Sequence, residues 1–270
     1  MIIDTHVHIG EMIGFSMPEQ MVLDSMAKYH IDYSLVSNIE SAEYDGNLNI
    51  IPKEYQISQT TSLEKSLKFA RENPDKIGVF HWIKPAFEKV DDKLENMIKD
   101  NLDIIHGIKV HPHNSKTALD DPKLEPYYEL AEKYNLPVTA HTGGCEEANS
   151  IHVYNAAIKH PKINFVMVHL GLGTDNKESI ELLGKADNLY GDTTWVPMEH
   201  IIDAVNKFGS EKILFGSDNP IDGLDTYHNN PKGEISIYPA YFNDLKGIIG
   251  EENYNNIMYK NAIRLFNLKF

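Results

Sequence analysis

Five short segments of this chain each carry side chains that commonly bind metal ions. They are Asp4-Thr5-His6-Val7-His8, Gly107-Ile108-Lys109-Val110-His111-Pro112, Thr139-Ala140-His141-Thr142-Gly143, Met167-Val168-His169-Leu170-Gly171 and Phe215-Gly216-Ser217-Asp218-Asn219-Pro220. All but the first follow an apolar or β-branched run and lead into glycine or proline, which is typical of strands bounded by turns. Imidazoles and carboxylates at the ends of successive strands are suited to binding a divalent metal.

The first segment places two imidazoles on one strand. Because residues two apart on a strand share a face, we expect Asp4, His6 and His8 to point the same way. Two histidines alone fit a solvated polar strand or a buried core as well as a metal site. Three later strand ends add His141, His169 and Asp218. The combined set predicts a metal site.

These side chains need a scaffold that brings distant strand ends together. Strands are predicted at about 2–8, 31–37, 77–83, 107–111, 137–141, 163–169, 188–193 and 212–217. Helices are predicted at about 19–29, from Thr61 or Ser62 to 73, 91–101, 123–134, 150–160, 176–186 and 198–208, with a helical tail from Tyr238 to Leu268. Eight such alternations over 270 residues predict one α/β domain, residues 1–270, in which a parallel sheet closes into a (β/α)8 barrel.

An open doubly wound sheet is the competing topology. It would usually carry a glycine-rich phosphate loop after its first strand, but neither GxGxxG nor GxxxxGKS/T occurs here. The longest irregular stretch, Asn38 to Thr60, follows the second strand. A loop of that length is predicted to be either a lid or wall of the substrate site, or an ordinary surface excursion.

The composition narrows the classes of partner. A net charge of −15 disfavours nucleic acid, and no apolar run approaches the length of a membrane helix. No secretory signal is visible, and the one cysteine, Cys145, fits a reducing cytoplasm, where we expect the protein to act. The two arginines, Arg71 and Arg264, fall in predicted helices, so we expect no arginine clamp for a carboxylate or phosphate.

The motifs resemble those of the amidohydrolase superfamily, and most closely its amidohydrolase-related branch. Residues 4–10 are similar to the first-strand DxHxHxG of that family, and HTG at 141–143 and FGSDNP at 215–220 are similar to its later motifs. The resemblance covers the whole chain. It implies a TIM barrel, here with a short C-terminal helical extension, and one or two divalent metal ions, usually zinc, at the carboxyl ends of the strands.

The resemblance also implies roles for the site residues. His6, His8 and His141 would bind the metal as neutral imidazoles, and Asp218 would ligate it or accept a proton from water. His169 would bind a second metal, polarise the substrate or transfer a proton.

Other side chains near the strand ends carry weaker expectations. Lys109 would bridge two metals if carboxylated, or else pair with an acidic residue or bind substrate. Further residues expected near the mouth are His81, Trp82, His111, His113, Cys145 and Trp195. The remaining histidines, expected on helices or loops without a role, are His30, His106, His152, His160, His200 and His228.

We therefore expect a metal-dependent hydrolase that uses activated water to cleave a small amide, cyclic amide, lactone or ester. Within the same branch, non-oxidative decarboxylation of an aromatic or unsaturated acid is an alternative. A binding barrel without catalysis is a third. The expected partner is a small-molecule substrate rather than nucleic acid or a membrane, and a homodimer is an expectation from the family alone.

Overall fold

The computed structural model describes residues 1–221 and 236–270, and within them nine strands form one curled sheet. The strands are β1 (Ile3–Met12), β2 (Phe15–Met17), β3 (Tyr33–Asn38), β4 (Ile77–Trp82), β5 (Ile105–Val110), β6 (Val138–Gly143), β7 (Phe165–Leu172), β8 (Leu189–Asp192) and β9 (Ile213–Leu214). Their order is β2-β1-β3-β4-β5-β6-β7-β8-β9, and every neighbouring pair is parallel except β1 with β2. The predicted fold class is confirmed.

The barrel closes where the segment after β9 meets β1. The amide of Thr5 donates to the carbonyl of Phe215 at 2.9 Å, that of Asp218 to His6 at 2.9 Å, and that of His8 to Asn219 at 2.8 Å. Val7 and Asn219 form a parallel bridge at the same place. The first and last strand segments therefore lie side by side, which unites residues from the two ends of the sequence.

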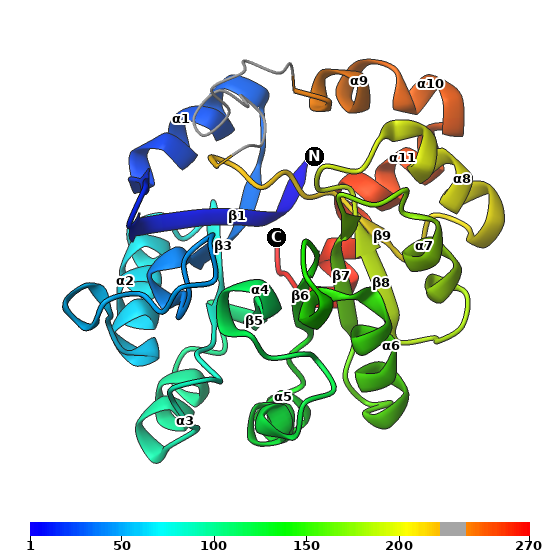
Figure 1. Ribbon diagram of the computed structural model, residues 1–270. Helices are drawn as coiled ribbons and strands as arrows, with labels where there is room; N and C mark the ends of the chain where they lie inside the picture. The colour runs from blue at the N-terminus through cyan, green and yellow to red at the C-terminus, as the bar shows by residue number, and fades with distance from the viewer. Residues whose placement is uncertain (222–235) are drawn as a thin grey trace.

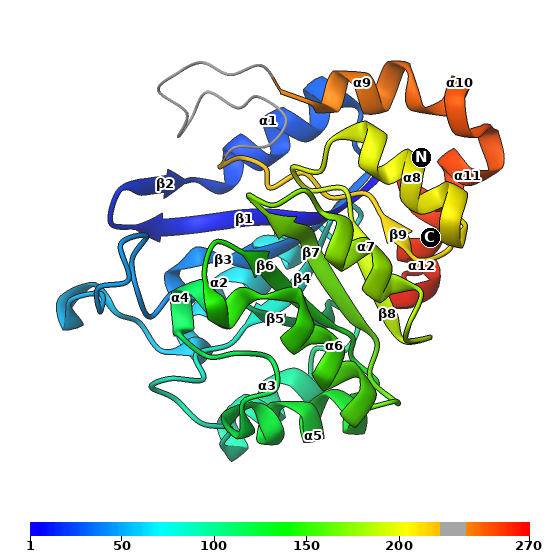
Figure 2. The same ribbon diagram turned by 45° about the vertical axis from the view of Figure 1, so that its right-hand side comes forward.

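Helices surround the sheet (Figures 1 and 2). They are α1 (Glu19–Tyr29), α2 (Gln59–Glu72), α3 (Asp92–Lys99), α4 (Pro112–Ser115), α5 (Glu125–Tyr134), α6 (Ser150–Lys159), α7 (Lys177–Leu183), α8 (Met198–Phe208), α9 (Tyr238–Asn243), α10 (Leu245–Ile249), α11 (Glu251–Asn255) and α12 (Asn261–Phe266), with a π-helical turn η5 (Asn256–Lys260) and 3-10 turns η1 (Ile39–Ser41), η2 (Lys53–Tyr55), η3 (Pro122–Leu124) and η4 (Glu146–Ala148). The main apolar core lies between them and the outer face of the strands, and includes Val7, Val79, Val138 and Phe165.

The helices begin where local sequence favours it. Pro18 precedes α1, and the Asp91 carboxylate accepts the amide of Leu94 at the start of α3. The predicted cap of α2 was wrong: Ser58, rather than Thr61 or Ser62, accepts the amide of Thr61. The earlier start buries Gln59 and Thr60, which are only 2% and 7% exposed.

The barrel interior near the amino-terminal ends of the strands is apolar. Ile3, Leu35, Phe80, Val166, Val168 and Leu214 form a second cluster, and α12 packs against it with Ala262, Leu265 and Phe266. Burying each large side chain contributes about 1.5–3 kcal/mol. The C-terminal extension therefore closes the amino-terminal end of the barrel, and polar residues concentrate at the opposite end.

Three local predictions need correction. β1 runs on to Met12 and turns back into β2 as a hairpin, and β9 has only two residues because the chain then bends into the site. His106 lies in β5, since that strand begins earlier than predicted. His228 lies outside the described residues.

The segment between β3 and α2 packs against the mouth of the barrel. The buried Glu43 carboxylate accepts the amides of Phe87 at 2.7 Å and Ala86 at 3.2 Å, and the amides of Glu43 and Tyr44 donate to Asn114. The position of this segment agrees with the prediction that it forms a wall of the substrate site. No described helix is long and apolar enough to cross a membrane.

Candidate metal centre

Two histidines of β1 lie at the centre of the site. His6 and His8 are each 3% exposed, and their Nε2 atoms are 2.7 Å apart. The Asp218 Oδ1 atom lies 3.4 Å from His6 Nε2 and 3.0 Å from His8 Nε2. Three potential ligand atoms from the first and last strand segments therefore converge on one point.

The separations of these atoms suit a bound cation. Ligands about 2.1 Å from a tetrahedral metal ion are about 3.4 Å from one another. The observed 3.4 Å distance has that size, and the 2.7 and 3.0 Å distances are shorter, so all three atoms are close enough to contact one ion. One ligand atom each from His6, His169 and Asp218 also lies within 4.8 Å of the other two. The residues therefore fit the divalent metal that the sequence predicts.

Backbone conformation brings Asp218 and His169 into the site. Both have left-handed φ angles of 70°. The Asp218 amide is held by the His6 carbonyl, and the His169 amide donates to the Asp192 Oδ1 atom at 2.9 Å. Such conformations are uncommon outside glycine and persist where the surrounding structure fixes them.

His169 presents its Nε2 as an acceptor. Its Nδ1 lies 3.2 Å from the carbonyl of Thr194, which can only accept, so Nδ1 carries the proton. Burial lowers the pKa of His169 to about 4. The neutral ring with a free Nε2 is suited to metal binding more than to donating a proton.

The other site histidines are also neutral. Burial lowers the pKa of His6 and His141 well below the ordinary value, and burial lowers that of His8 despite its hydrogen bond to Asp218. Burial alone would raise the pKa of Asp218, but His8, His169 and Lys109 together hold it below the ordinary value. Neutral imidazoles and an ionised carboxylate are the forms in which these groups bind metals.

Lys109 reaches the same centre from β5. Its Nζ lies 3.3 Å from His6 Nε2, and the side chain is 1% exposed. Burial lowers the pKa of Lys109 to about 8, against the opposing attraction of Asp218 and Asp192. The amine therefore lies beside the centre, and its role, as a carboxylated bridge, a partner of an acidic residue or a substrate-binding group, stays a prediction.

The amidohydrolase family model matches residues 3–268. The chain belongs to the amidohydrolase family. Solved structures of similar fold include a 2,6-dihydroxybenzoate decarboxylase complexed with 2,6-dihydroxybenzoate, at 16% identity and a TM-score of 0.70, with 99% of each chain covered. No curated protein matches the sequence.

Two further structures differ in the chemistry that their names state. A 4-oxalomesaconate hydratase from Rhodopseudomonas palustris has 17% identity and a TM-score of 0.66, covering 99% of this chain and 96% of its own. A probable 2-pyrone-4,6-dicarboxylic acid hydrolase from Acinetobacter baumannii has 14% identity and a TM-score of 0.66, covering 99% of each chain. Similarity at these identities shows the amidohydrolase fold alone.

A small cavity of about 150 Å³ lies above the histidines in this amidohydrolase fold. Its described lining consists of His8, Met12, Ile39, Gly46, Trp82, His111, His113, Asn114, His141, His169, Leu172, Asp218 and Ile221. The His111 ring is stacked between Trp82, at 5.0 Å and 6°, and His141, at 4.0 Å and 14°. The two rings predicted to lie near the mouth thus form a flat wall next to His141.

His141 packs beside His169. Its ring centroid is 4.7 Å from that of His169, whose own centroid is 5.2 Å from that of His6. His6 Nε2 lies within 3.4 Å of His8 Nε2, Asp218 Oδ1 and Lys109 Nζ, and the His141 ring lies beside that of His169. The complete ligand set stays a prediction.

Asp192 is a site residue that sequence analysis missed. It ends β8, is fully buried, and places Oδ2 3.6 Å from His6 Nδ1. Burial raises the pKa of Asp192 to about 6, so the group is largely ionised at neutral pH. An acidic residue at the end of a predicted strand was the available signal, but it lacks the pattern of the family motifs.

Asp4 supports the site from behind rather than joining it. The pairing of β1 with β3 shifts register between Asp4 and Val7. The Asp4 carboxylate accepts the Ser217 hydroxyl at 2.5 Å and the amides of Ser217 and His6 at 3.1 Å each. These bonds join β1 to the segment that carries Asp218.

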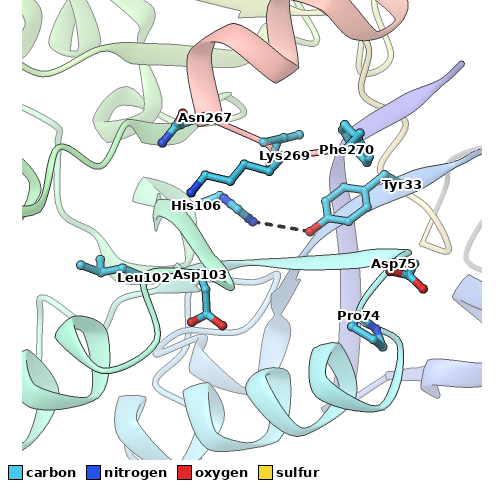
Figure 3. A pocket seen from close by; sticks show the side chains of 10 residues that line it. Tyr33, Pro74, Asp75, Leu102, Asp103, His106, Asn267, Lys269 and Phe270 are labelled. Carbon is cyan, nitrogen blue, oxygen red and sulfur yellow. Dashed lines mark hydrogen bonds between the residues drawn. The ribbon is translucent and has the colours of Figure 1, made fainter.

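A second cavity, of about 350 Å³, lies at the opposite end of the amidohydrolase barrel (Figure 3). Among its lining residues are Tyr33, Asp103, His106, Lys269 and Phe270. The Tyr33 hydroxyl is 3.5 Å from His106 Nε2, and His106 Nδ1 is 3.2 Å from the carbonyl of Phe266. Each ring nitrogen of His106 therefore has a hydrogen-bond partner, and the acidic side chains around the cavity are exposed.

Proposed function

We propose that this protein is a divalent-metal-dependent hydrolase of a small amide, cyclic amide, lactone or ester. The observation that carries the proposal is the convergence of His6 Nε2, His8 Nε2 and Asp218 Oδ1 within 2.7–3.4 Å of one another. Family membership supports metal-dependent catalysis, and the geometry supports these residues as its centre.

The metal would be held by His6, His8 and Asp218, with His169 or His141 completing the set. When bound, such a cation supplies Lewis acidity, which polarises a carbonyl and lowers the pKa of water to about 7. The chain contributes a rigid set of neutral imidazoles, since each ring is almost fully buried.

Asp218 is the group best suited to move the proton. It is ionised at neutral pH because its neighbours hold its pKa below the ordinary value. Its carboxylate borders the cavity and can accept a proton from the attacking water. The same oxygen can then return that proton to the leaving nitrogen or oxygen of the substrate.

The cavity favours a small substrate of low charge. No lysine or arginine is among its described lining residues, and apolar walls come from Met12, Ile39, Leu172 and Ile221. A substrate with several carboxylates would find no cationic partner there apart from the metal and the nearby Lys109. A neutral or singly charged compound fits these surroundings better.

Non-oxidative decarboxylation is the second candidate. The parallel Trp82 and His111 rings form a flat wall that suits an aromatic or unsaturated acid. Structures of similar fold include proteins named as decarboxylases of such acids. In that reaction Asp218 would assist proton transfer to carbon.

A substrate panel separates the two candidates. Zinc-loaded protein is assayed against small lactones, esters and amides by acid release, and against aromatic acids by carbon dioxide release. Acid release that disappears in Asp218→Asn supports hydrolysis, and carbon dioxide release that disappears in the same variant supports the second candidate. Full activity in Asp218→Asn would refute the role of this carboxylate in either reaction.

A further inference from the structure

The histidines of the centre differ in what holds their second nitrogen. His8 Nδ1 lies 3.0 Å from the Ser37 hydroxyl, and His169 Nδ1 lies 3.2 Å from the Thr194 carbonyl. These contacts leave Nε2 of each ring facing the centre. His6 Nδ1, in contrast, is buried and has no hydrogen-bond partner among the described residues. Its nearest charged neighbour is Asp192 Oδ2, at 3.6 Å.

Asp192 is itself tightly held. Its Oδ1 accepts the amides of His169 at 2.9 Å and Thr194 at 3.1 Å, and its Oδ2 accepts the Thr194 hydroxyl at 2.6 Å. One carboxylate thus contacts the backbone of one candidate ligand, His169, and faces the ring of another, His6. Because these bonds come from β7 and from the turn after β8, the carboxylate has little freedom to turn away.

Gly216 gives independent support for this arrangement. A Cβ atom at this position would lie 2.7 Å from Asp192 Oδ2, 2.5 Å from Thr194 Oγ1 and 3.1 Å from His6 Cβ. Real Cβ atoms do not approach other atoms as closely as 2.7 Å. The glycine in the FGSDNP segment therefore leaves the space in which the Asp192 carboxylate approaches His6.

We infer that Asp192 is a positioning residue that keeps the proton of His6 on Nδ1, so that Nε2 offers its lone pair to the metal. A carboxylate only accepts hydrogen bonds, so the other tautomer would set the Nδ1 lone pair against a negative oxygen. Carboxylates that orient metal-binding histidines in this way affect affinity strongly. The inference rests on the proposed metal centre but not on the reaction that it catalyses.

The first test is the tautomer of His6 in metal-free wild-type protein, read from long-range ¹⁵N–¹H correlations of the imidazole. Assignment comes from the loss of one ring in His6→Gln. We expect the proton on Nδ1. A proton on Nε2 would overturn the inference without any need for an Asp192 variant.

The second test is cobalt(II) affinity, measured by visible absorption in competition with a chelator. Asp192→Asn should weaken binding about 10- to 100-fold and move the His6 proton toward Nε2, because an amide can donate to Nδ1. Asp103→Asn is the matched control, since it makes the same substitution at an exposed residue of the cavity at the other end of the barrel. It should change affinity by less than about threefold.

The outcomes distinguish this inference from the proposed function. Wild-type protein that binds no cobalt would refute the metal centre. Tight wild-type binding that is unchanged in folded Asp192→Asn would refute only the positioning role. If Asp192→Asn fails to fold, Gly216→Ala tests the same contact, because its added methyl would lie 2.7 Å from Asp192 Oδ2 and 2.5 Å from Thr194 Oγ1, and this hydrogen-bonded pair would have to shift. Unchanged affinity and tautomer in that variant would again refute the role.

Discussion

The two ends of this barrel each contain a cavity with histidine and acidic side chains, and only one resembles a catalytic centre. The cavity at the amino-terminal end is the larger, at about 350 Å³ against about 150 Å³. Its histidine, His106, has a partner for each ring nitrogen. At the carboxyl end, His6 Nε2, His8 Nε2 and Asp218 Oδ1 lie within 2.7–3.4 Å of one another.

The contrast shows that the volume of a cavity is a poor guide to its function in this fold. The carboxyl ends of the strands lead into long loops, where conformation is free to vary. The other end is closed by α12, whose side chains fill the interior. Convergence of buried ligand atoms from distant segments of the chain separates the two ends more clearly than cavity size does.

The largest expected effect is at Asp218. Replacing it with asparagine should lower kcat about 10²- to 10⁴-fold, because the variant loses the ionised oxygen that faces His8. Steady-state kinetics on the substrate identified by the panel measures this. Asp103→Asn, in the far cavity, is the control and should keep kcat within about twofold. An equal loss in both variants would remove the functional distinction between the two ends.

Metal binding should also distinguish the two ends of the barrel. Dialysis against a chelator should abolish turnover, and zinc or manganese should restore it, because neutral His6 and His8 are placed to bind a divalent cation. His8→Ala should weaken cobalt binding at least about 100-fold. His106→Ala, at the far end, should bind cobalt as the wild type does. Full activity in metal-free protein would contradict the proposed centre.

A pH effect on stability is expected at the wall of the catalytic end. Burial raises the pKa of Glu43 to about 7 from its ordinary value of 4.5. Between those values the folded state binds more protons than the unfolded state, so stability falls as pH rises. The contribution is on the order of 1–3 kcal/mol.

Glu43→Gln should remove that part of the pH dependence. Urea unfolding at about pH 5 and about pH 7 measures the free energy of unfolding in both proteins. Glu54→Gln, an exposed side chain of the same segment, should behave as the wild type does. If the free energy of unfolding changed with pH as much in Glu43→Gln as in the wild type, Glu43 would titrate without coupling to folding.

The smallest effect is expected from His106→Gln. The substitution disturbs two contacts at the far end, to Tyr33 and Phe266, and should cost about 1 kcal/mol of unfolding free energy. Turnover should stay within about twofold of wild type. A large loss of activity would show that the far cavity is coupled to the catalytic end.

Much of the fold could be predicted because its signals are local. The apolar runs fix the eight parallel strands, and α1 and α8 begin and end where the sequence pattern indicates. The β1–β2 hairpin was missed, since Ile13 and Gly14 carry no clear turn pattern and the extension of β1 beyond His8 depends on pairing with β2.

The site was only partly predictable, for a physical reason. Residue type and strand position identified His6, His8, His141, His169 and Asp218 as candidates. The orientation of Asp192 depends on contacts with Thr194, His169 and the space left by Gly216, which come from three strand ends. Similarly, the tautomer of His169 follows from one backbone carbonyl that no sequence pattern specifies.

The pairing of β1 with the segment after β9, which closes the barrel, has a consequence for biosynthesis. His6 and His8 leave the ribosome before the segment that carries Asp218, which follows all eight parallel strands. Until that segment emerges, the nascent polypeptide has the imidazoles of His6 and His8 without the Asp218 carboxylate. The cation-binding centre is completed only when Phe215, Asp218 and Asn219 pair with the initial strand, so metal acquisition should be a late step in maturation.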